Sequence, residues 1–140
     1  MKISIIGTGY VGLVSGACLA DLGHTVVCVD VVQTKVDAIN KGECPIYEEG
    51  LPQIIARNVA ASRLSATTDL KRAILDTELS LIAAPTPFDG QYIDLKYIKQ
   101  IAADIGAILR DKPSYHAVVV KSTVVPGTVS YTHLRAHETL

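Results

Sequence analysis

Hydrophobic residues along this chain fall into short unbroken runs that alternate with segments of helical spacing. Apolar or β-branched runs predict strands at residues 2–7, 25–30, 64–68, 79–87 and 116–123. Most of these runs are continuously apolar instead of alternating between apolar and polar residues. Continuous runs are typical of strands in a parallel sheet that is covered on both faces.

Helical patterns occupy the segments between these runs, at residues 10–22, 32–42, 53–64, 70–76 and 95–110. Gly23 and Gly42 follow two of them in the position that favours a helix C-terminus, and Asp69 and Asp94 precede the last two as candidate N-caps. Residues 43–52 contain two prolines and a glycine, which predicts an irregular loop. Strands that alternate with helices in this way predict a doubly wound α/β domain.

The composition fits one globular domain, since 49% of the 140 residues are hydrophobic and 19% are charged. A net charge of −1 gives no attraction to nucleic acid or to an anionic membrane. No apolar run has the length of a membrane span or the features of a signal peptide, which predicts a cytoplasmic protein. Cys18, Cys28 and Cys44 are interpreted as small buried hydrophobes in a reducing compartment.

A glycine-rich stretch, IIGTGYVGLVSG, lies where the first strand gives way to the first helix. Glycine weakens a helix, so another requirement must explain Gly7, Gly9 and Gly12. In the dinucleotide-binding pattern the first glycine permits a tight turn, the second lets backbone N–H groups approach a pyrophosphate, and the third lets helix and strand pack closely. Gly16, one turn further on, is expected to keep that packing close.

The context of the motif strengthens this interpretation. It follows a strand and opens a helix, and an acidic residue about 20 positions further on, here Asp30, ends the next strand. Asp30 is expected to accept hydrogen bonds from the adenosine ribose and to repel a 2′-phosphate, which favours NAD over NADP. Lys35 lies close enough in sequence to soften that repulsion. The alternative, a glycine-rich turn without a dinucleotide, explains fewer of these features.

Two threonines follow predicted strands, at the edge where open α/β sheets bind ligands. The hydroxyls of Thr86 and Thr123 can hydrogen-bond a ribose, a nicotinamide amide or a water, although each residue fits an ordinary turn equally well. Glu48 and Glu49 are adjacent carboxylates, which can serve in acid–base chemistry but are more often a solvated corner.

The histidines give weaker signals. His24 is expected at the surface, and His116 opens a strand without an evident partner. His133 and His137 could face one way on a helix, but no third ligand accompanies them, so no metal site is predicted.

The motifs together resemble the nucleotide-sugar 6-dehydrogenases, the family of UDP-glucose and GDP-mannose dehydrogenases. The matching stretches, which run in order to about residue 129, are IIGTGYVGLVSGACLADLGHTVVCVD, TKVDAIN, CPIYEEGL, AAPTP, DLKYI and KSTVVPGT. Glu49 stands where the family commonly has proline, and Pro85 where many members have glycine. CPIYEEGL and KSTVVPGT argue against a different dehydrogenase of the β-hydroxyacid type.

The resemblance implies roles for individual residues. The backbone at Tyr10 and Val11 would meet the cofactor phosphates, Asp30 and Lys35 the adenosine side, and Thr86 and Thr123 the nicotinamide end. Thr123 would also lie near the reacting sugar carbon. Family members oxidise the sugar C6 alcohol to a carboxylate with two NAD⁺, through a cysteine-bound thiohemiacetal and thioester, and work as cytoplasmic dimers or higher oligomers.

The end of the chain departs from the family. We expect residues 1–129 to be the NAD-binding domain and residues 130–140, which resemble translated adapter sequence, to be foreign to it. The central region, the second domain and the catalytic Gly-Gly-x-Cys motif are not recognisable. The chain alone is therefore expected to bind NAD without completing the oxidation. A stand-alone NAD-binding module is the alternative, and among substrates UDP-glucose is slightly favoured over GDP-mannose.

Overall fold

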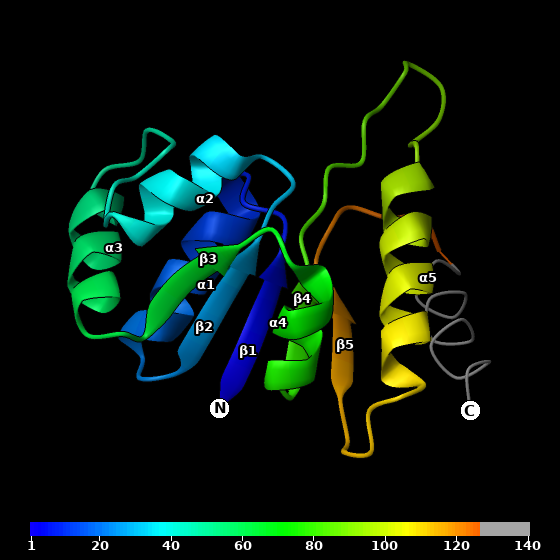
Figure 1. The fold of residues 1–140 in the computed structure, drawn as a ribbon. Coiled ribbons are helices and arrows are strands. Elements are labelled where there is room, and N and C mark those ends of the chain that lie inside the picture. The colour runs from blue at the N-terminus through cyan, green and yellow to red at the C-terminus, as the bar shows by residue number, and fades with distance from the viewer. Residues whose placement is uncertain (127–140) are drawn as a thin grey trace.

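The computed structural model describes residues 1–126 and shows five parallel strands in one sheet (Figure 1). The strands are β1 (Lys2–Ile6), β2 (Thr25–Val29), β3 (Leu64–Thr67), β4 (Leu79–Ile82) and β5 (Ala117–Val120). Their order across the sheet is β3-β2-β1-β4-β5, and every neighbouring pair is parallel. The predicted doubly wound α/β fold is therefore confirmed, with the strand order reversing between β1 and β4.

Five helices connect the strands. They are α1 (Tyr10–Asp21), α2 (Gln33–Asn40), α3 (Leu51–Ala60), α4 (Leu70–Asp76) and α5 (Lys96–Leu109). The start of α3 corrects the predicted loop at 43–52, because Leu51 and Pro52 are already helical. Proline is tolerated in a first helical turn, where its missing N–H would have no partner, and Gly50 turns the chain into the helix with φ of 79°.

One of the two predicted aspartate caps is present: Asp69 is the N-cap of α4, whereas the N-cap of α5 is Leu95, one residue after Asp94, and the Leu95 side chain makes no capping hydrogen bond. The Asp69 carboxylate accepts a hydrogen bond from the backbone N–H of Arg72 at 3.0 Å. Asp94 accepts one from the N–H of Lys96 at 2.8 Å, at the first residue of α5. Each bond satisfies a backbone donor that has no partner within its own helix.

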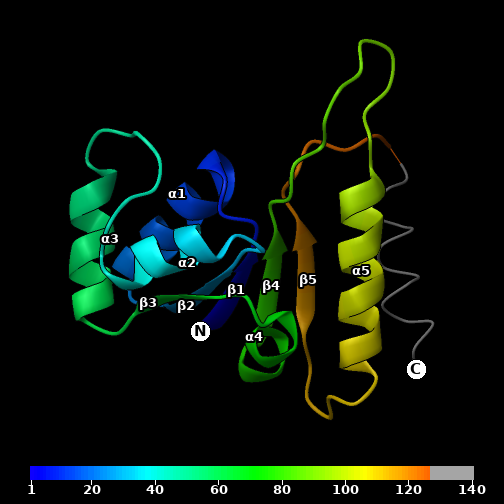
Figure 2. The same ribbon diagram turned by 45° about the horizontal axis from the view of Figure 1, so that its top comes forward.

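The core lies in two layers, one on each face of the sheet. One hydrophobic cluster joins β1, β2 and β3 to α1, α2 and α3, and the other joins β1, β2 and β4 to α4 and α5. Figures 1 and 2 both show the segment between β4 and α5 projecting beyond the carboxyl ends of the strands. The sheet is therefore buried on both faces, whereas the loops at its carboxyl edge remain accessible.

The cysteines correct one expectation. Cys28 is fully buried, and burial raises the pKa of its thiol to about 12, so this group is inert. Cys44 is half-buried, but Cys18 is exposed on α1. Cys18 leaves the core because Gly16, Ala17 and Ala20 take the buried face of that helix.

Candidate dinucleotide-binding site

The turn after β1 is held by backbone packing that excludes side chains. Gly7 has φ of +105°, and a Cβ there would lie 2.7 Å from the carbonyl oxygen of Ala83, just past β4. A Cβ on Gly12 would lie 2.0 Å from the carbonyl oxygen of Gly7. Both positions therefore require glycine, because strand and helix approach within backbone contact of each other.

Gly16 extends the same close packing by one helical turn. A Cβ on it would lie 3.1 Å from the Cys28 sulfur and 3.2 Å from Cγ1 of Ile5. The first helix is thus pressed against β1 and β2 along its amino-terminal half. That contact fixes the direction in which the start of α1 points.

Gly9 differs from the other glycines, because a Cβ on it would meet nothing within 4 Å. It is the N-cap of α1, no side chain caps the helix, and its first turn contains no acidic residue. The backbone of Tyr10 and Val11 follows directly, with N–H groups that have no acceptor inside the helix. Open space, free amide donors and the positive end of a helix dipole together suit a phosphate.

Asp30 lies at the end of β2, beside this turn. Its Oδ2 accepts hydrogen bonds from Thr8, one from the backbone N–H at 3.0 Å and one from the hydroxyl. Its Oδ1 accepts a bond from the N–H of Val32 at 2.9 Å. Partial burial raises the pKa of the Asp30 carboxyl, but these bonds and the nearby charge of Lys35 outweigh it and hold the pKa below its usual value.

The loop before α3 contacts the start of α1. The Tyr10 hydroxyl donates to Oε2 of Glu48 at 2.6 Å, and this bond raises the pKa of Tyr10. Glu49 is exposed, as is Tyr47. The two adjacent glutamates thus have different surroundings, and Glu48 ties its loop to the glycine-rich turn.

Thr86 and Thr123 follow neighbouring parallel strands, β4 and β5, at the carboxyl edge of the sheet. Thr86 is half-buried and Thr123 is exposed. The two segments are joined by Ser122, whose hydroxyl donates to the carbonyl of Ala84 at 2.7 Å. The roles of Ser122 and Thr8 could not be predicted, because the sequence of a turn does not show whether its serine or threonine joins two strands.

His116 has partners, contrary to the expectation from sequence. Its Nε2 lies 2.7 Å from the Ser80 hydroxyl, and its Nδ1 lies 2.9 Å from the Lys112 ammonium, which also donates to the carbonyl of Thr77. Nδ1 also lies 3.1 Å from the carbonyl oxygen of Thr77, so the Lys112 ammonium favours an accepting Nδ1 whereas the carbonyl favours a protonated one. Burial, and then the Lys112 charge, hold the pKa of His116 below its usual value. This network lies where β5 begins, away from the glycine-rich turn.

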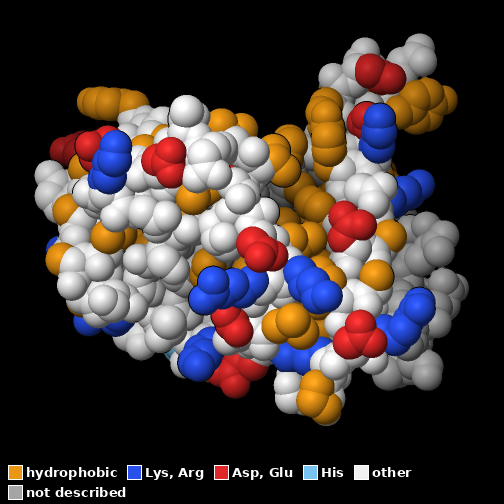
Figure 3. All heavy atoms as spheres, viewed as in Figure 1, with side chains coloured by type: hydrophobic (Ala, Val, Ile, Leu, Met, Phe, Trp, Pro, Cys, Tyr) orange, Lys and Arg blue, Asp and Glu red, His pale blue; other side chains and the backbone are white. Residues whose placement is uncertain are grey.

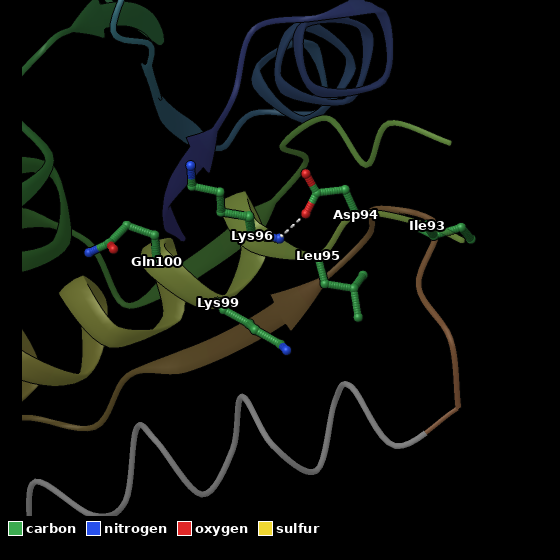
Figure 4. A pocket seen from close by; sticks show the side chains of 6 residues that line it. All are labelled: Ile93, Asp94, Leu95, Lys96, Lys99 and Gln100. Atoms are coloured by element: carbon green, nitrogen blue, oxygen red, sulfur yellow. Dashed lines mark hydrogen bonds between the residues drawn. The ribbon is translucent and has the colours of Figure 1, made fainter. Parts of the chain in front are cut away.

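The surface is hollowed between the part of the molecule that carries α1 and α2 and the loop that precedes α5 (Figure 3). Hydrophobic side chains gather in this crevice, above the carboxyl ends of the strands. Figure 4 shows a separate hollow of about 590 Å³ at the start of α5, lined by Ile93, Asp94, Leu95, Lys96, Lys99 and Gln100. That hollow is built by one continuous segment at the start of α5.

Other predicted features lie outside this crevice. His24 is half-buried, with its Nδ1 3.2 Å from the amino terminus of Met1. His133 and His137 lie outside the described residues, as does the segment 130–140. Within residues 1–126, no group of three or more His, Cys, Asp or Glu side chains is placed to hold a metal ion. No helix in this part of the chain is long and apolar enough to cross a membrane.

These features meet where the strand order of the parallel sheet reverses. They are a glycine-rich turn, a helix start with free amides and an acid at the end of the second strand. Together they define a dinucleotide-binding domain. Residues 1–139 match the model of the UDP-glucose/GDP-mannose dehydrogenase family, NAD binding domain. The chain belongs to this family and is its NAD-binding domain.

Relatives of known name agree with this assignment. The chain is 48% identical over 132 residues to GDP-mannose 6-dehydrogenase of Pseudomonas aeruginosa, covering 93% of this chain and 30% of the relative. It is 49% identical over 131 residues to UDP-glucose 6-dehydrogenase of Rhizobium meliloti, covering 91% and 29%. The chain thus spans about a third of the length of the relatives that it matches.

Solved structures agree as well. A ternary complex of GDP-mannose dehydrogenase from Pseudomonas aeruginosa superposes with a TM-score of 0.94 at 45% identity, covering 99% of this chain and 32% of that one. A UDP-glucose dehydrogenase from Pyrobaculum islandicum superposes with a TM-score of 0.87 at 36% identity, covering 96% and 32%.

Proposed function

We propose that this domain holds NAD⁺ for an enzyme that oxidises the C6 alcohol of a nucleotide sugar to a carboxylate. The observation that carries the proposal is the start of α1, where open space at Gly9 is followed by the backbone amides of Tyr10 and Val11, which have no acceptor inside the helix. Asp30, beside that turn, supplies a carboxylate for the adenosine ribose, and the positive charge of Lys35 lies close to it.

Bound NAD⁺ supplies the hydride acceptor, and two equivalents account for the four electrons of the oxidation. The residues of this chain bind and orient. The amides at Tyr10 and Val11 hold the phosphates, and Thr86 and Thr123 hydrogen-bond the nicotinamide end. Thr123, at the open end of β5, would lie nearest the reacting sugar carbon. Of the three described cysteines, none has the neighbours of the family's nucleophile, so the covalent step belongs to another part of the complete enzyme.

The proposal extends to the substrate and setting of the complete enzyme. UDP-glucose and GDP-mannose are both candidates, because the relatives named for them match this chain at 49% and 48% identity. We favour UDP-glucose slightly, on the resemblance of the opening stretch. The complete enzyme is proposed to be a cytoplasmic homo-oligomer, in keeping with the family and with free thiols at Cys18, Cys28 and Cys44.

Calorimetric titration of the chain with NAD⁺ tests the cofactor role. We expect saturable binding that Asp30→Ala weakens about tenfold, because hydrogen bonds to a charged group contribute about 1.5–3 kcal/mol. Asp37→Ala is the matched control, since Asp37 is an exposed acid on α2. A folded chain that does not bind NAD⁺, or equal effects of the two substitutions, would overturn the proposal. In a complete enzyme carrying this domain, NADH formation with each sugar nucleotide identifies the substrate.

A further inference from the structure

Thr8, the residue between the first two glycines of the motif, is fully buried, yet both of its polar donors point to one atom. Its backbone N–H and its hydroxyl each donate to Oδ2 of Asp30. The N–H of Val32 donates to the other carboxylate oxygen, Oδ1. The ends of β1 and β2 are thereby joined through a single side chain.

The acceptor capacity of Asp30 decides what is left for a ligand. An ionised carboxylate offers about four acceptor positions, two on each oxygen. Thr8 occupies both positions on Oδ2, and Val32 occupies one on Oδ1. One position therefore remains, and it lies on Oδ1.

We propose that Thr8 is a positioning residue that presents Oδ1 of Asp30 to the adenosine ribose and sets the preference for NAD over NADP. The inference rests on the proposed function, in which Asp30 meets that ribose. Beyond the partial compensation that the charge of Lys35 offers, a 2′-phosphate is accommodated if the carboxylate turns away from it or becomes protonated. Thr8 and Val32 hold both oxygens, so turning away breaks hydrogen bonds to a charged group.

A purely structural role for Thr8 makes a different prediction. Loss of a tie between β1 and β2 would disturb the whole turn and weaken both dinucleotides by the same factor. A positioning role acts on the 2′ substituent, so it changes the ratio of the two dissociation constants. The ratio for NAD⁺ and NADP⁺ therefore separates the two roles.

The experiment compares Thr8→Val, which keeps the branched shape and loses the hydroxyl, with Thr8→Ser, which keeps the hydroxyl. Dissociation constants for NAD⁺ and NADP⁺ are measured by calorimetry on the 140-residue chain, with NADP⁺ measured by competition where its binding is weak. We expect Thr8→Val to weaken the binding of NAD⁺ about fivefold and to lower the preference for NAD⁺ over NADP⁺ by about the same factor. Thr8→Ser should keep the preference within about twofold of wild type, because the donor to Oδ2 remains.

Circular dichroism checks that each variant is folded, and Thr8→Ala replaces Thr8→Val if the latter is not. An unchanged preference in the hydroxyl-free variant, or an equal loss in Thr8→Ser, overturns the inference while wild-type NAD⁺ binding keeps the proposed function intact. A folded wild-type chain that does not bind NAD⁺ overturns the proposed function, and the inference with it.

Discussion

Two regions at the carboxyl edge of the sheet are fixed by different means. The turn between β1 and α1 is held by backbone contacts, with Gly12 closing on the carbonyl of Gly7 and Gly7 closing on that of Ala83. The segments after β4 and β5 are instead joined by side chains, such as Ser122 with the carbonyl of Ala84. Ser80, His116 and Lys112 form a second network of side chains, which lies at the opposite, amino edge of the sheet, where β5 begins.

The difference concerns how much each region can change. A backbone contact at van der Waals distance leaves no room for a methyl group, so the phosphate-binding turn admits only glycine at its closest points. Side-chain ties can be replaced one at a time, with a cost set by the hydrogen bond that is lost. The phosphate end of the site thus tolerates few substitutions, whereas the end near Thr86 and Thr123 tolerates more.

Gly12→Ala should give the largest effect, because its Cβ would lie 2.0 Å from the Gly7 oxygen and would force α1 away from β1. We expect a loss of about 3 kcal/mol in the free energy of unfolding, at the upper end of the usual cost of overpacking. Urea denaturation followed by circular dichroism measures it. An unchanged midpoint would contradict the close backbone contact on which the comparison rests.

Gly9→Ala is the matched control, since its Cβ would meet nothing in the protein. It should change the free energy of unfolding by about 1 kcal/mol or less, because Gly9 is an N-cap in extended backbone that alanine also adopts and no side-chain cap hydrogen bond is lost. NAD⁺ affinity should nevertheless fall, because the methyl group occupies the space proposed for the phosphates. Gly12→Ala would then lower the free energy of unfolding, whereas Gly9→Ala, three positions earlier, would lower mainly the affinity for NAD⁺.

His116→Gln tests the second network of side chains, at the start of β5. The pKa of His116 is lowered in the folded protein, so the unfolded chain binds more protons as pH falls through the normal histidine pKa. The stability that His116 contributes is therefore complete above about pH 6.5 and is lost below it. We expect the wild-type free energy of unfolding to decrease from pH 7.5 to 5.5, and the variant to lose part of that decrease. At pH 7.5 the variant should be less stable by about 1 kcal/mol, the usual net value of a hydrogen bond.

His24→Gln provides the comparison, because His24 is a histidine of the same chain that lies apart from the Ser80 network. Denaturation at several pH values measures all three proteins. The variant at His24 should keep the wild-type decrease that the variant at His116 loses. Equal pH profiles for wild type and His116→Gln would show that the network does not hold the imidazole neutral.

The strands and helices could be predicted because their signals are local. Apolar or β-branched runs marked every strand. Asp69 marked the start of α4 as its N-cap, and Asp94 lies just before the N-cap of α5. The predicted start of α3 was wrong, because Pro52 suits a loop and a first helical turn equally well. The predicted burial of Cys18 was wrong. Burial on α1 depends on which face of the helix meets the sheet, and the sequence of α1 is apolar nearly all round.

The candidate site could be predicted only where spacing along the chain carries it. Gly7, Gly9, Gly12 and Asp30 stand at intervals that a dinucleotide requires, so the turn and the acid could be placed in advance. The contacts of Thr8, Ser122 and His116 could not be predicted, because they join residues that are far apart in the sequence. The intervals of a motif record backbone geometry, whereas hydrogen bonds between side chains depend on the packed fold.

Tyr10→Phe should give the smallest effect, and it tests where the two kinds of region meet. The phenol oxygen bonds only the exposed edge of the Glu48 loop, while the proposed phosphate contact uses the backbone at Tyr10. We expect the free energy of unfolding to fall by less than about 1 kcal/mol, since a solvent-accessible hydrogen bond is exchanged for bonds to water. NAD⁺ affinity by calorimetry should stay within about threefold of wild type, and Glu48→Gln, which keeps an acceptor for the hydroxyl, should behave alike. A tenfold loss of affinity in Tyr10→Phe would mean that the side chain and its loop shape the phosphate site in addition to the backbone packing of the turn.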